Sequence, residues 1–460
     1  MRADSPAMHR DDDSRDPAPP TRKEGHVKRL RDAVHGDILL GPAELELLDT
    51  PQMQRLRGIR QLGAAYYVYP AAQHTRFEHC LGTCWTAKQI VSRIESQASF
   101  RFPELEKQAI FLAALVHDVT HIPFGHTFED ERKLLARHDE SERRHAHFFE
   151  RGELSEALHR DEAGRLALQI VRPGAALPVG LRYLRQIVSG TICADLLDYL
   201  KRDNYFCGLS QHYDPRVLDY FTVAGGELVL DLQHQGLFRH DALSEITNLL
   251  RIRYVLSERV YYHHAKIACG VMISKAIERA MTAGLTEEEL CQLTDDALLY
   301  HLRERYSADR CLLELVDELT ARQLFKRCYM LTRRVGADAV HELVRKFHLN
   351  ENGARATAEQ RIAAALGAAP HEVALYCAPE QMTLKEAEVP VILGGGKLGR
   401  LSDLSSAEIQ VLKDKHRQLW CTYVFVSRRL AGDVRRAGDV CEDVIGFPNE
   451  LPEEMRGRLA

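Results

Sequence analysis

Apolar residues recur at helical spacing from Val27 onward for roughly three hundred residues, in the i, i+3, i+4 pattern of helices that bury one face. The pattern is clearest over residues 111–116, 187–200, 243–256 and 271–281. Helix-breaking residues occur along this stretch, namely Pro103, Pro123, Pro173, Gly190 and Pro215. The spacing therefore predicts a mainly helical body over residues 27–330.

The pattern changes after about residue 370. Short runs rich in β-branched and aromatic residues, at 373–377, 389–393 and 419–426, are separated by turn-forming residues. They predict a C-terminal extension over residues 331–460 that is partly helical and contains a small mixed α/β lobe. The glycine-rich stretch 394–397 follows one predicted strand but lacks the spacing and the Ser/Thr of a phosphate loop, which favours a simple turn.

Residues 1–26 are rich in Asp, Arg and Pro and have few apolar side chains, which predicts a disordered tail. Their polar, acidic start does not resemble a secretory signal, and no apolar run is long enough to span a membrane. The eleven cysteines include no CxxC pair, and the net charge of −5 argues against a nucleic-acid coat. We therefore expect a soluble, cytoplasmic protein.

Histidines accompany carboxylates in two segments, at residues 73–79 and 117–126, and a third segment at residues 192–203 carries further carboxylates. In the second, an apolar helix over 109–116 is expected to place His117 and Asp118 side by side at its C-terminal end. Imidazole and carboxylate groups together suit a divalent metal of borderline hardness. An isolated His-Asp pair more often only ends a helix, so this segment alone does not establish a metal site.

The third segment places an acidic, a phenolic and a basic side chain on one helical face. Asp195, Asp198, Tyr199 and Arg202 lie at i, i+3, i+4 and i+7. On the opposite face lie three apolar residues, Leu196, Leu197 and Leu200. The polar face fits either a solvated helix surface or a pocket that holds a metal, a sugar and phosphates.

Taken in order, His79, His117-Asp118 and Asp195 form an H…HD…D series that resembles the HD superfamily of metal-dependent phosphohydrolases. The blocks DTPQMQRLRGIRQLG (49–63), HTRFEHCLG (74–82), HDVTHIPFGHTFED (117–130) and ADLLDYLKRD (194–203) look like the dNTP triphosphohydrolase branch, whose best-known member joins a sterile alpha motif to an HD domain. The resemblance covers about residues 27–330. We expect no sterile alpha motif, since only the predicted tail precedes the HD body.

The resemblance implies a role for individual residues. The metal ligands would be His79, His117, Asp118 and Asp195, holding Fe, Mn, Zn, Co or Ni, with Mg accompanying the substrate phosphates. The catalytic histidines would be His121, His126 and His138, one of which protonates the leaving 5′-oxygen. The substrate would contact Gln61, Leu62, Arg76, Tyr199, Asp203 and Tyr261. Each histidine could instead simply hold a loop in place.

The resemblance also implies a regulatory nucleotide site between subunits, formed by Asp49, Gln54, Arg57 and Arg322. The alternative is that the first three brace a helix. Arg31 and Asp37 depart from the regulated pattern, and Leu196 replaces a phosphate-binding lysine. We therefore expect a constitutive homo-oligomer, a dimer or a tetramer, with little response to GTP.

The implied activity is metal-dependent hydrolysis of deoxynucleoside triphosphates to deoxynucleoside and tripolyphosphate. One alternative is an HD phosphohydrolase or phosphodiesterase that acts on another nucleotide. Another is a nucleotide- or nucleic-acid-binding regulator with an idle HD pocket. Basic clusters are present at Arg55, Arg57, Arg60, Lys326 and Arg327, although a solvated basic face explains them equally well.

Overall fold

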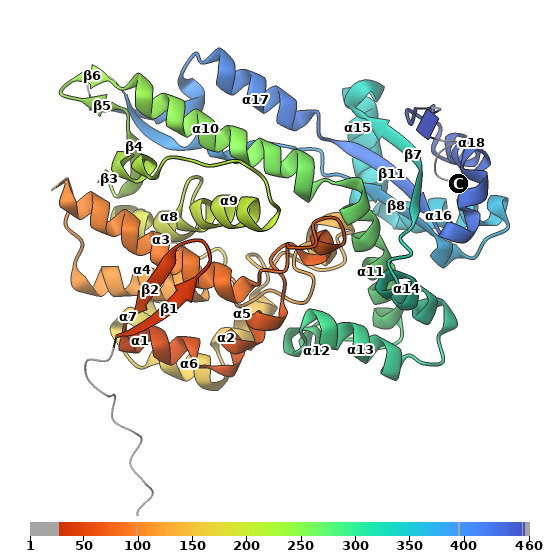
Figure 1. Cartoon of the computed structure of the whole chain (residues 1–460), viewed down its shortest axis with the longest axis horizontal. Helices are drawn as coiled ribbons and strands as arrows, with labels where there is room; N and C mark the ends of the chain where they lie inside the picture. Colours follow the sequence, from red (N-terminus) through yellow and green to blue (C-terminus); the bar gives the residue numbers. More distant parts are fainter. Residues whose placement is uncertain (1–26, 98, 394–395, 453, 456–460) are drawn as a thin grey trace, which may run out of the picture.

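The mainly helical body is confirmed by the computed structural model of the chain, which describes residues 27–97, 99–393, 396–452 and 454–455 (Figure 1). The predicted tail over residues 1–26 lies outside the described residues. The α-helices are α1 Pro42–Leu48, α2 Pro51–Arg55, α3 Arg76–Ser96, α4 Glu104–Val116, α5 Glu142–Phe149, α6 Gly152–His159, α7 Glu162–Val171, α8 Arg182–Ser189, α9 Ala194–Phe206, α10 His240–Leu256, α11 His264–Thr282, α12 Glu287–Gln292, α13 Asp295–Arg305, α14 Arg310–Thr320, α15 Ala337–Leu343, α16 Ala354–Leu366, α17 Ala407–Arg417 and α18 Val434–Ile445. No helix in these described ranges is long and apolar enough to cross a membrane.

The strands are short and form small sheets. They are β1 Lys28–Asp32, β2 Gly36–Leu40, β3 Phe221–Ala224, β4 Glu227–Asp231, β5 Gln233–His234, β6 Leu237–Phe238, β7 Lys326–Thr332, β8 Val373–Cys377, β9 Pro390–Leu393, β10 Lys397–Arg400 and β11 Cys421–Val426. One sheet has the order β10-β9-β4-β3, a second has the order β7-β11-β8, and β1-β2 and β5-β6 form hairpins. Strands β8, β9 and β11 agree with the three predicted β-rich runs. Residues 394 and 395 of the predicted glycine-rich turn lie outside the described residues.

The prediction of a single helix over residues 187–200 is wrong. The chain there forms two helices, because α8 ends at Ser189 and α9 begins at Ala194. Gly190 follows α8, and a Cβ atom at that position would approach the Gln186 carbonyl oxygen to 2.6 Å. Only glycine allows the chain to turn this tightly. The break places Asp195 in the first turn of α9 rather than in the middle of a longer helix.

Helices α3, α4 and α9 form the layer that carries the candidate site. Thr75 and Glu78 form a capping box that starts α3, with the Thr75 N–H donating to Glu78 Oε2 at 2.6 Å. Apolar α4 packs against both α3 and α7. Helix α9 crosses α3 so closely at Gly82 that a Cβ atom there would lie 1.9 Å from Asp198 Oδ1. Gly82 therefore permits the contact that brings Asp195 toward α3.

The C-terminal lobe is built around β11, which is buried along its whole length between β7 and β8 (Figure 1). Helices α16 and α18 pack on this sheet. A buried ion cluster joins the lobe to the helical body: Glu359 of α16 accepts hydrogen bonds from Arg132 Nη1 and Lys275 Nζ, each at 2.8 Å. Strand β9 also pairs in parallel with β4. The predicted boundary between residues 330 and 331 stays a prediction.

Candidate metal centre and adjoining cavity

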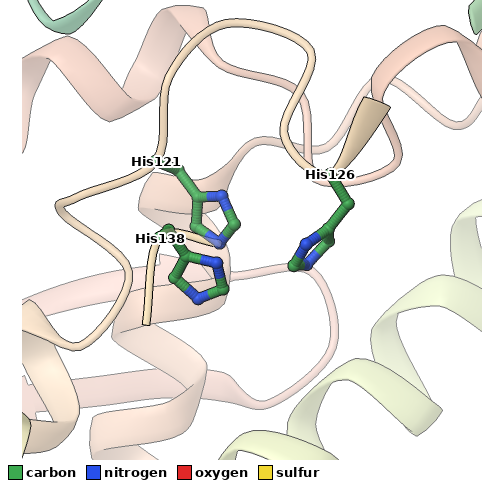
Figure 2. A group of neighbouring side chains, drawn as sticks. All are labelled: His121, His126 and His138. Carbon is green, nitrogen blue, oxygen red and sulfur yellow. The ribbon is translucent and has the colours of Figure 1, made fainter. Parts of the chain in front are cut away.

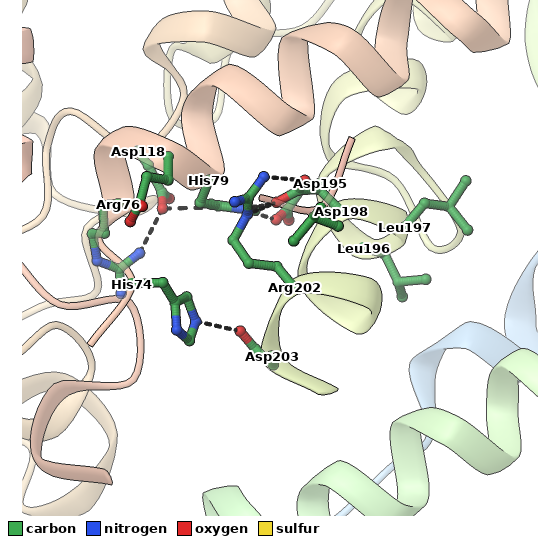
Figure 3. Close-up of polar contacts among 12 residues, drawn as sticks. His74, Arg76, His79, Asp118, Asp195, Leu196, Leu197, Asp198, Arg202 and Asp203 are labelled. Carbon is green, nitrogen blue, oxygen red and sulfur yellow. Dashed lines mark hydrogen bonds and ion pairs between the residues drawn. The ribbon is translucent and has the colours of Figure 1, made fainter. Parts of the chain in front are cut away.

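Four side chains from three helices meet at one point. His79 lies in the first turn of α3, His117 and Asp118 directly follow α4, and Asp195 lies in the first turn of α9. His79 Nε2 is 3.0 Å from Asp195 Oδ1 and 3.8 Å from Asp118 Oδ2 (Figure 3). His117 Nε2 is 3.6 Å from Asp118 Oδ1 and 3.9 Å from Asp195 Oδ1. The structure thus brings together the four residues that the sequence proposes as metal ligands.

The chemistry of this donor set fits a divalent metal. His117 Nδ1 lies 2.8 Å from the Ala114 carbonyl oxygen. Because a carbonyl only accepts, Nδ1 carries the proton and Nε2 keeps its lone pair. That Nε2 atom is buried and has no hydrogen-bond partner among the described residues, although it lies beside two carboxylates. Nitrogen lone pairs and carboxylate oxygens converging in this way suit a transition metal. His79, His117 and Asp118 present ligand atoms within 4.8 Å of one another.

Arg76, also in the first turn of α3, is buried next to this cluster. Its Nη1 donates to Asp118 Oδ2 at 2.5 Å. Although burial favours the protonated carboxyl, the Arg76 and His121 charges hold the pKa of Asp118 well below its usual range. The Arg76 Nε and Nη2 atoms are buried without a hydrogen-bond partner in the described part of the chain. A buried cation with two unused donors is well suited to bind an anion in the cavity that it lines.

The three histidines that the resemblance marks as catalytic form a second cluster (Figure 2). The His121 and His138 rings stack at 3.6 Å, and nitrogen atoms of His121, His126 and His138 lie within 4.8 Å of one another. This trio could itself hold a metal ion. His121 Nε2 also lies 3.2 Å from Asp118 Oδ1, so the two clusters are in contact.

Glu129 was missed by the sequence analysis, although it lies within one of the quoted blocks, three residues after His126. Its fully buried carboxylate accepts from His126 Nδ1 at 3.0 Å and from His138 Nδ1 at 3.3 Å. Burial favours the neutral acid, but these histidines hold the pKa of Glu129 below its usual range. Arg144 Nη1 donates to the other oxygen at 2.5 Å. Glu129 therefore orients two of the three rings and leaves their Nε2 atoms free to act.

Two long-range contacts hold the loop that carries these histidines. Arg55 Nη2 donates to the backbone carbonyls of Val119 and His121, at 2.9 and 2.6 Å. Asp295, at the start of α13, accepts from the Phe124 N–H at 2.7 Å. Arg55 is thereby engaged within its own chain. Whether the protein binds nucleic acid stays untested.

The clusters open into a cavity of about 780 Å³. The residues that the resemblance assigns to substrate all line it: Gln61, Leu62, Arg76, Tyr199, Asp203 and Tyr261. The sequence analysis missed a second set of lining residues, namely Arg253, Tyr262 and Lys266 from α10, α11 and the segment between them, and Tyr376, Gln381, Met382, Lys385, Glu386 and His416 from the C-terminal lobe. No motif marks these positions.

Contacts within the cavity wall fix several of these side chains. Asp203 accepts from His74 Nε2 at 2.9 Å (Figure 3). It also accepts from Tyr261 Oη at 2.6 Å. The Arg253 guanidinium lies over the rings of Tyr199 and Tyr261 and is 3.3 Å from Glu386. The C-terminal lobe thus contacts the aromatic wall through an ion pair.

The polar stripe of α9 divides between two surroundings. Asp195 and Tyr199 line the cavity, whereas Asp198 and Arg202 are fully buried and face α3 (Figure 3). Leu196 and Leu197 point away from these charges into the core. The stripe is therefore neither a solvated surface nor one continuous pocket wall.

The residues expected to bind a regulatory nucleotide contact their own chain. Gln54 Oε1 accepts from Arg57 Nε at 2.8 Å, and the Arg57 guanidinium lies 3.6 Å from the Phe77 ring centroid. Asp49 ends α1, and Arg322 Nη2 donates to the Tyr67 carbonyl at 3.0 Å. These contacts fit the bracing alternative, and a regulatory role stays a prediction. The departing residues Arg31 and Asp37 pair with each other at 3.1 Å.

Comparison with protein families finds two matching models: the HD domain over residues 76–203 and the HD-associated region over residues 216–450. The chain is 31% identical over 310 residues to an uncharacterized protein of Methanocaldococcus jannaschii, covering 65% of this chain and 59% of that protein. It is 28% identical to the deoxynucleoside triphosphate triphosphohydrolases SAMHD1 of Gallus gallus and Homo sapiens, over 65% of this chain and 56% and 54% of theirs. The chain thus spans little more than half the length of these relatives.

Two solved structures share the fold. A hypothetical protein from Aquifex aeolicus superposes with a TM-score of 0.67 at 24% identity, covering 90% of this chain and all of that chain. A phosphohydrolase from Bacteroides thetaiotaomicron superposes with a TM-score of 0.63 at 22% identity, covering 87% and 99%. Both matches extend through the C-terminal lobe, so the lobe belongs to the shared architecture.

Proposed function

The chain belongs to the HD-domain family whose members carry an HD-associated region, and we propose that it hydrolyses deoxynucleoside triphosphates to deoxynucleoside and tripolyphosphate. The activity printed for the SAMHD1 relatives motivates this choice of substrate. One observation carries the proposal. An orphaned His117 nitrogen beside two carboxylates and an Arg76 guanidinium with two unused donors face the same cavity.

His79, His117, Asp118 and Asp195 would hold the metal. A divalent ion bound there supplies Lewis acidity toward a phosphoryl oxygen and lowers the pKa of water. Arg76 would hold the phosphate next to these ligands through its free Nε and Nη2 atoms, in the planar two-donor geometry that guanidinium offers to phosphate. The hydrogen bond from Arg76 Nη1 to Asp118 fixes the orientation of the guanidinium group.

His126 is best placed to protonate the leaving 5′-oxygen. Its side chain is 40% exposed, against 1% for His121 and 12% for His138, so it reaches furthest into the open cavity. Glu129 holds its Nδ1 proton and leaves Nε2 to face the substrate. Imidazole is the side chain used most often as a general acid or base, which suits this role.

Sugar recognition would fall to the wall formed by Tyr199, Tyr261 and Asp203. Gln61 and Leu62 line the same cavity, and Gln61 Oε1 is a buried acceptor without a hydrogen-bond partner among the described residues. It would accept from the ribose 3′-hydroxyl. Crowding at Leu62 would exclude a 2′-hydroxyl and select deoxyribose.

The test is to incubate metal-analysed protein with each dNTP and each NTP and to separate the products by chromatography. The proposal expects intact tripolyphosphate and deoxynucleoside from the dNTPs alone. Early release of orthophosphate or of diphosphates would contradict it and favour a general nucleotide hydrolase. Binding without turnover in protein of full metal content would favour a regulator with an idle pocket.

We further propose that the protein is a constitutive dimer or tetramer whose activity responds modestly or not at all to added GTP. A nucleotide can shift assembly only by its differential affinity for the assembled state. The Arg31–Asp37 pair replaces part of the expected regulatory site, and Gln54 and Arg57 are already engaged with each other. Light scattering after size exclusion, with and without GTP, tests this. A monomer that forms an active tetramer only with nucleotide would contradict it.

A further inference from the structure

A chain of buried polar contacts leads from the β1–β2 hairpin to the proposed metal ligand His79. His79 Nδ1 lies 2.7 Å from Asp198 Oδ2, while His79 Nε2 faces Asp195 and Asp118. The Asp198 carboxylate only accepts, so His79 Nδ1 carries a proton and Nε2 is the nitrogen that remains for a metal. Asp198 therefore sets both the tautomer and the direction of the ring toward the cluster (Figure 3).

Asp198 is itself held from two sides. Arg202 donates from Nε to Oδ2 at 2.9 Å and from Nη2 to Oδ1 at 3.0 Å. His35, in the turn of the hairpin, donates from Nε2 to Asp198 Oδ1 at 2.6 Å. Asp198 and Arg202 are fully buried, so neither contact competes with water.

The hairpin also holds Arg202. Asp32 Oδ2 accepts from Arg202 Nη1 at 2.8 Å, and Asp32 Oδ1 accepts from the backbone N–H groups of Val34 and His35 at 2.9 and 2.8 Å. Asp32 thus shapes the turn that presents His35 and at the same time fixes the guanidinium beneath it. None of Asp32, His35, Asp198 and Arg202 is among the residues that line the cavity.

We propose, on the basis of the proposed metal-dependent function, that the β1–β2 hairpin is a positioning element of the metal centre. Asp32 and His35 hold Arg202 and Asp198, and Asp198 orients His79. Hydrogen-bond partners of ligating histidines raise ligand basicity and fix ring orientation, and their loss costs about 10- to 100-fold in metal affinity. The hairpin therefore contributes to metal binding although it supplies no ligand.

The experiment measures Mn²⁺ affinity by chelator competition, together with the melting temperature of the metal-free protein and the visible spectrum of the Co²⁺-loaded protein. Asp198→Asn is expected to weaken Mn²⁺ binding about 10- to 100-fold and to alter the Co²⁺ spectrum. His35→Ala is expected to weaken it about tenfold. His35→Gln restores a side-chain N–H donor and is expected to recover most of that loss. Arg29→Gln, on the exposed face of the same hairpin, is the matched control.

Asp198→Asn removes a buried charge, and the variant would be uninformative if it failed to fold. In that case the comparison of His35→Ala with His35→Gln tests the proposal. Unchanged Mn²⁺ affinity and Co²⁺ spectrum in His35→Ala would overturn the role of the hairpin. The proposal would also be overturned if His35→Ala lowered the Mn²⁺ affinity only in step with a lower melting temperature of the metal-free protein, and if His35→Gln did not restore the affinity. The readouts need no substrate, so a wild type that binds Mn²⁺ but cleaves no dNTP would disprove the proposed function and leave this test intact.

Discussion

The two walls of the cavity are built by different means. The wall with the His-Asp clusters comes from α3, α4, α9 and the loop after α4, in short sequence blocks whose charges are buried and paired, as with Arg76 and Asp118. The other wall comes from the C-terminal lobe, where no motif marks the lining residues: the pairing of β8 with β11 positions Tyr376, and Glu386 lies in a short 3₁₀ helix, in contact with Arg253. The first wall is specified by local sequence and holds the proposed metal ligands, whereas the second is positioned by tertiary packing and shapes the cavity. Changes in the first should alter turnover, and changes in the second should alter affinity or stability.

Asp118→Ala should produce the largest effect, because Asp118 contacts a ligand, Arg76 and His121 at once. We expect loss of bound metal and a fall in kcat of more than about 100-fold, beyond the usual cost of losing a ligand's supporting contact. Elemental analysis and a dNTP assay check this, with circular dichroism to verify folding. Asp219→Ala, at a half-buried position outside the cavity lining, is the control. Full metal content in Asp118→Ala would disprove the ligand assignment.

Glu359→Gln should separate the lobe's contribution to stability from catalysis. Although burial opposes ionisation, the Arg132 and Lys275 charges lower the pKa of Glu359 from 4.5 to about 2. A pKa lowered on folding stabilises the protein above the unfolded pKa, and this contribution disappears as the pH falls from about 4.5 toward 2. The shift corresponds to about 3 kcal/mol of unfolding free energy at pH 7.

Urea unfolding of wild type and Glu359→Gln between pH 7 and pH 3 measures this contribution. The difference between the two proteins should be largest at pH 7 and should narrow in acid. Glu351→Gln, which removes an exposed carboxylate on the same lobe, should change little. A pH-independent difference would show that Gln destabilises the site by packing rather than by lost charge.

Arg76→Lys keeps the positive charge but removes the planar fork. Hydrogen bonds to charged groups contribute about 1.5–3 kcal/mol, so losing one phosphate contact should reduce kcat/KM about 10- to 100-fold. Arg93→Lys, on the exposed face of the same helix, is the matched control. Steady-state kinetics with a dNTP measure this change. Equal kcat/KM for Arg76→Lys and wild type would exclude phosphate binding by Arg76.

Glu386→Gln should have the smallest effect, and mainly on binding. The substitution weakens the ion pair that holds Arg253 over Tyr199 and Tyr261. The aromatic wall therefore loses a supporting contact, while no group proposed to take part in the reaction is changed. We expect KM to rise about five- to tenfold, as for the net loss of one ordinary hydrogen bond of about 1 kcal/mol, with kcat nearly unchanged. Glu388→Gln, two residues along and outside the cavity lining, is the control. A fall in kcat without a change in KM would place this wall in the chemistry.

Local sequence predicted the motif-bearing wall well, because its residues are fixed by helix ends. The apolar run of α4 ends at Val116 and places His117 and Asp118 where the pattern expects them. Helical periodicity could not tell which buried neighbour each side of α9 would meet, so the separation of Asp198 and Arg202 from the cavity was not predictable. Helical periodicity also predicted one helix where the structure has α8 and α9, because the apolar spacing continues across the break at Gly190.

The C-terminal wall could not be predicted for a different reason. Tyr376 and Glu386 reach the cavity through sheet pairing and the contact with Arg253, which depend on residues far apart in the sequence. Glu129 is an intermediate case, since its spacing from His126 lies within one helical turn. Only the fold shows that its carboxylate is shared with His138.

The central position of β11 has a consequence for protein synthesis. All four proposed metal ligands leave the ribosome long before β11, the strand on which both β7 and β8 pair. Until that strand emerges, two hydrophobic strands present unpaired edges, a form of exposed surface that favours association with other chains. A ribosome that pauses before residue 421 therefore displays a complete His-Asp motif without a finished cavity. The protein gains its second wall, and pairs the inner edges of β7 and β8, in the same late step.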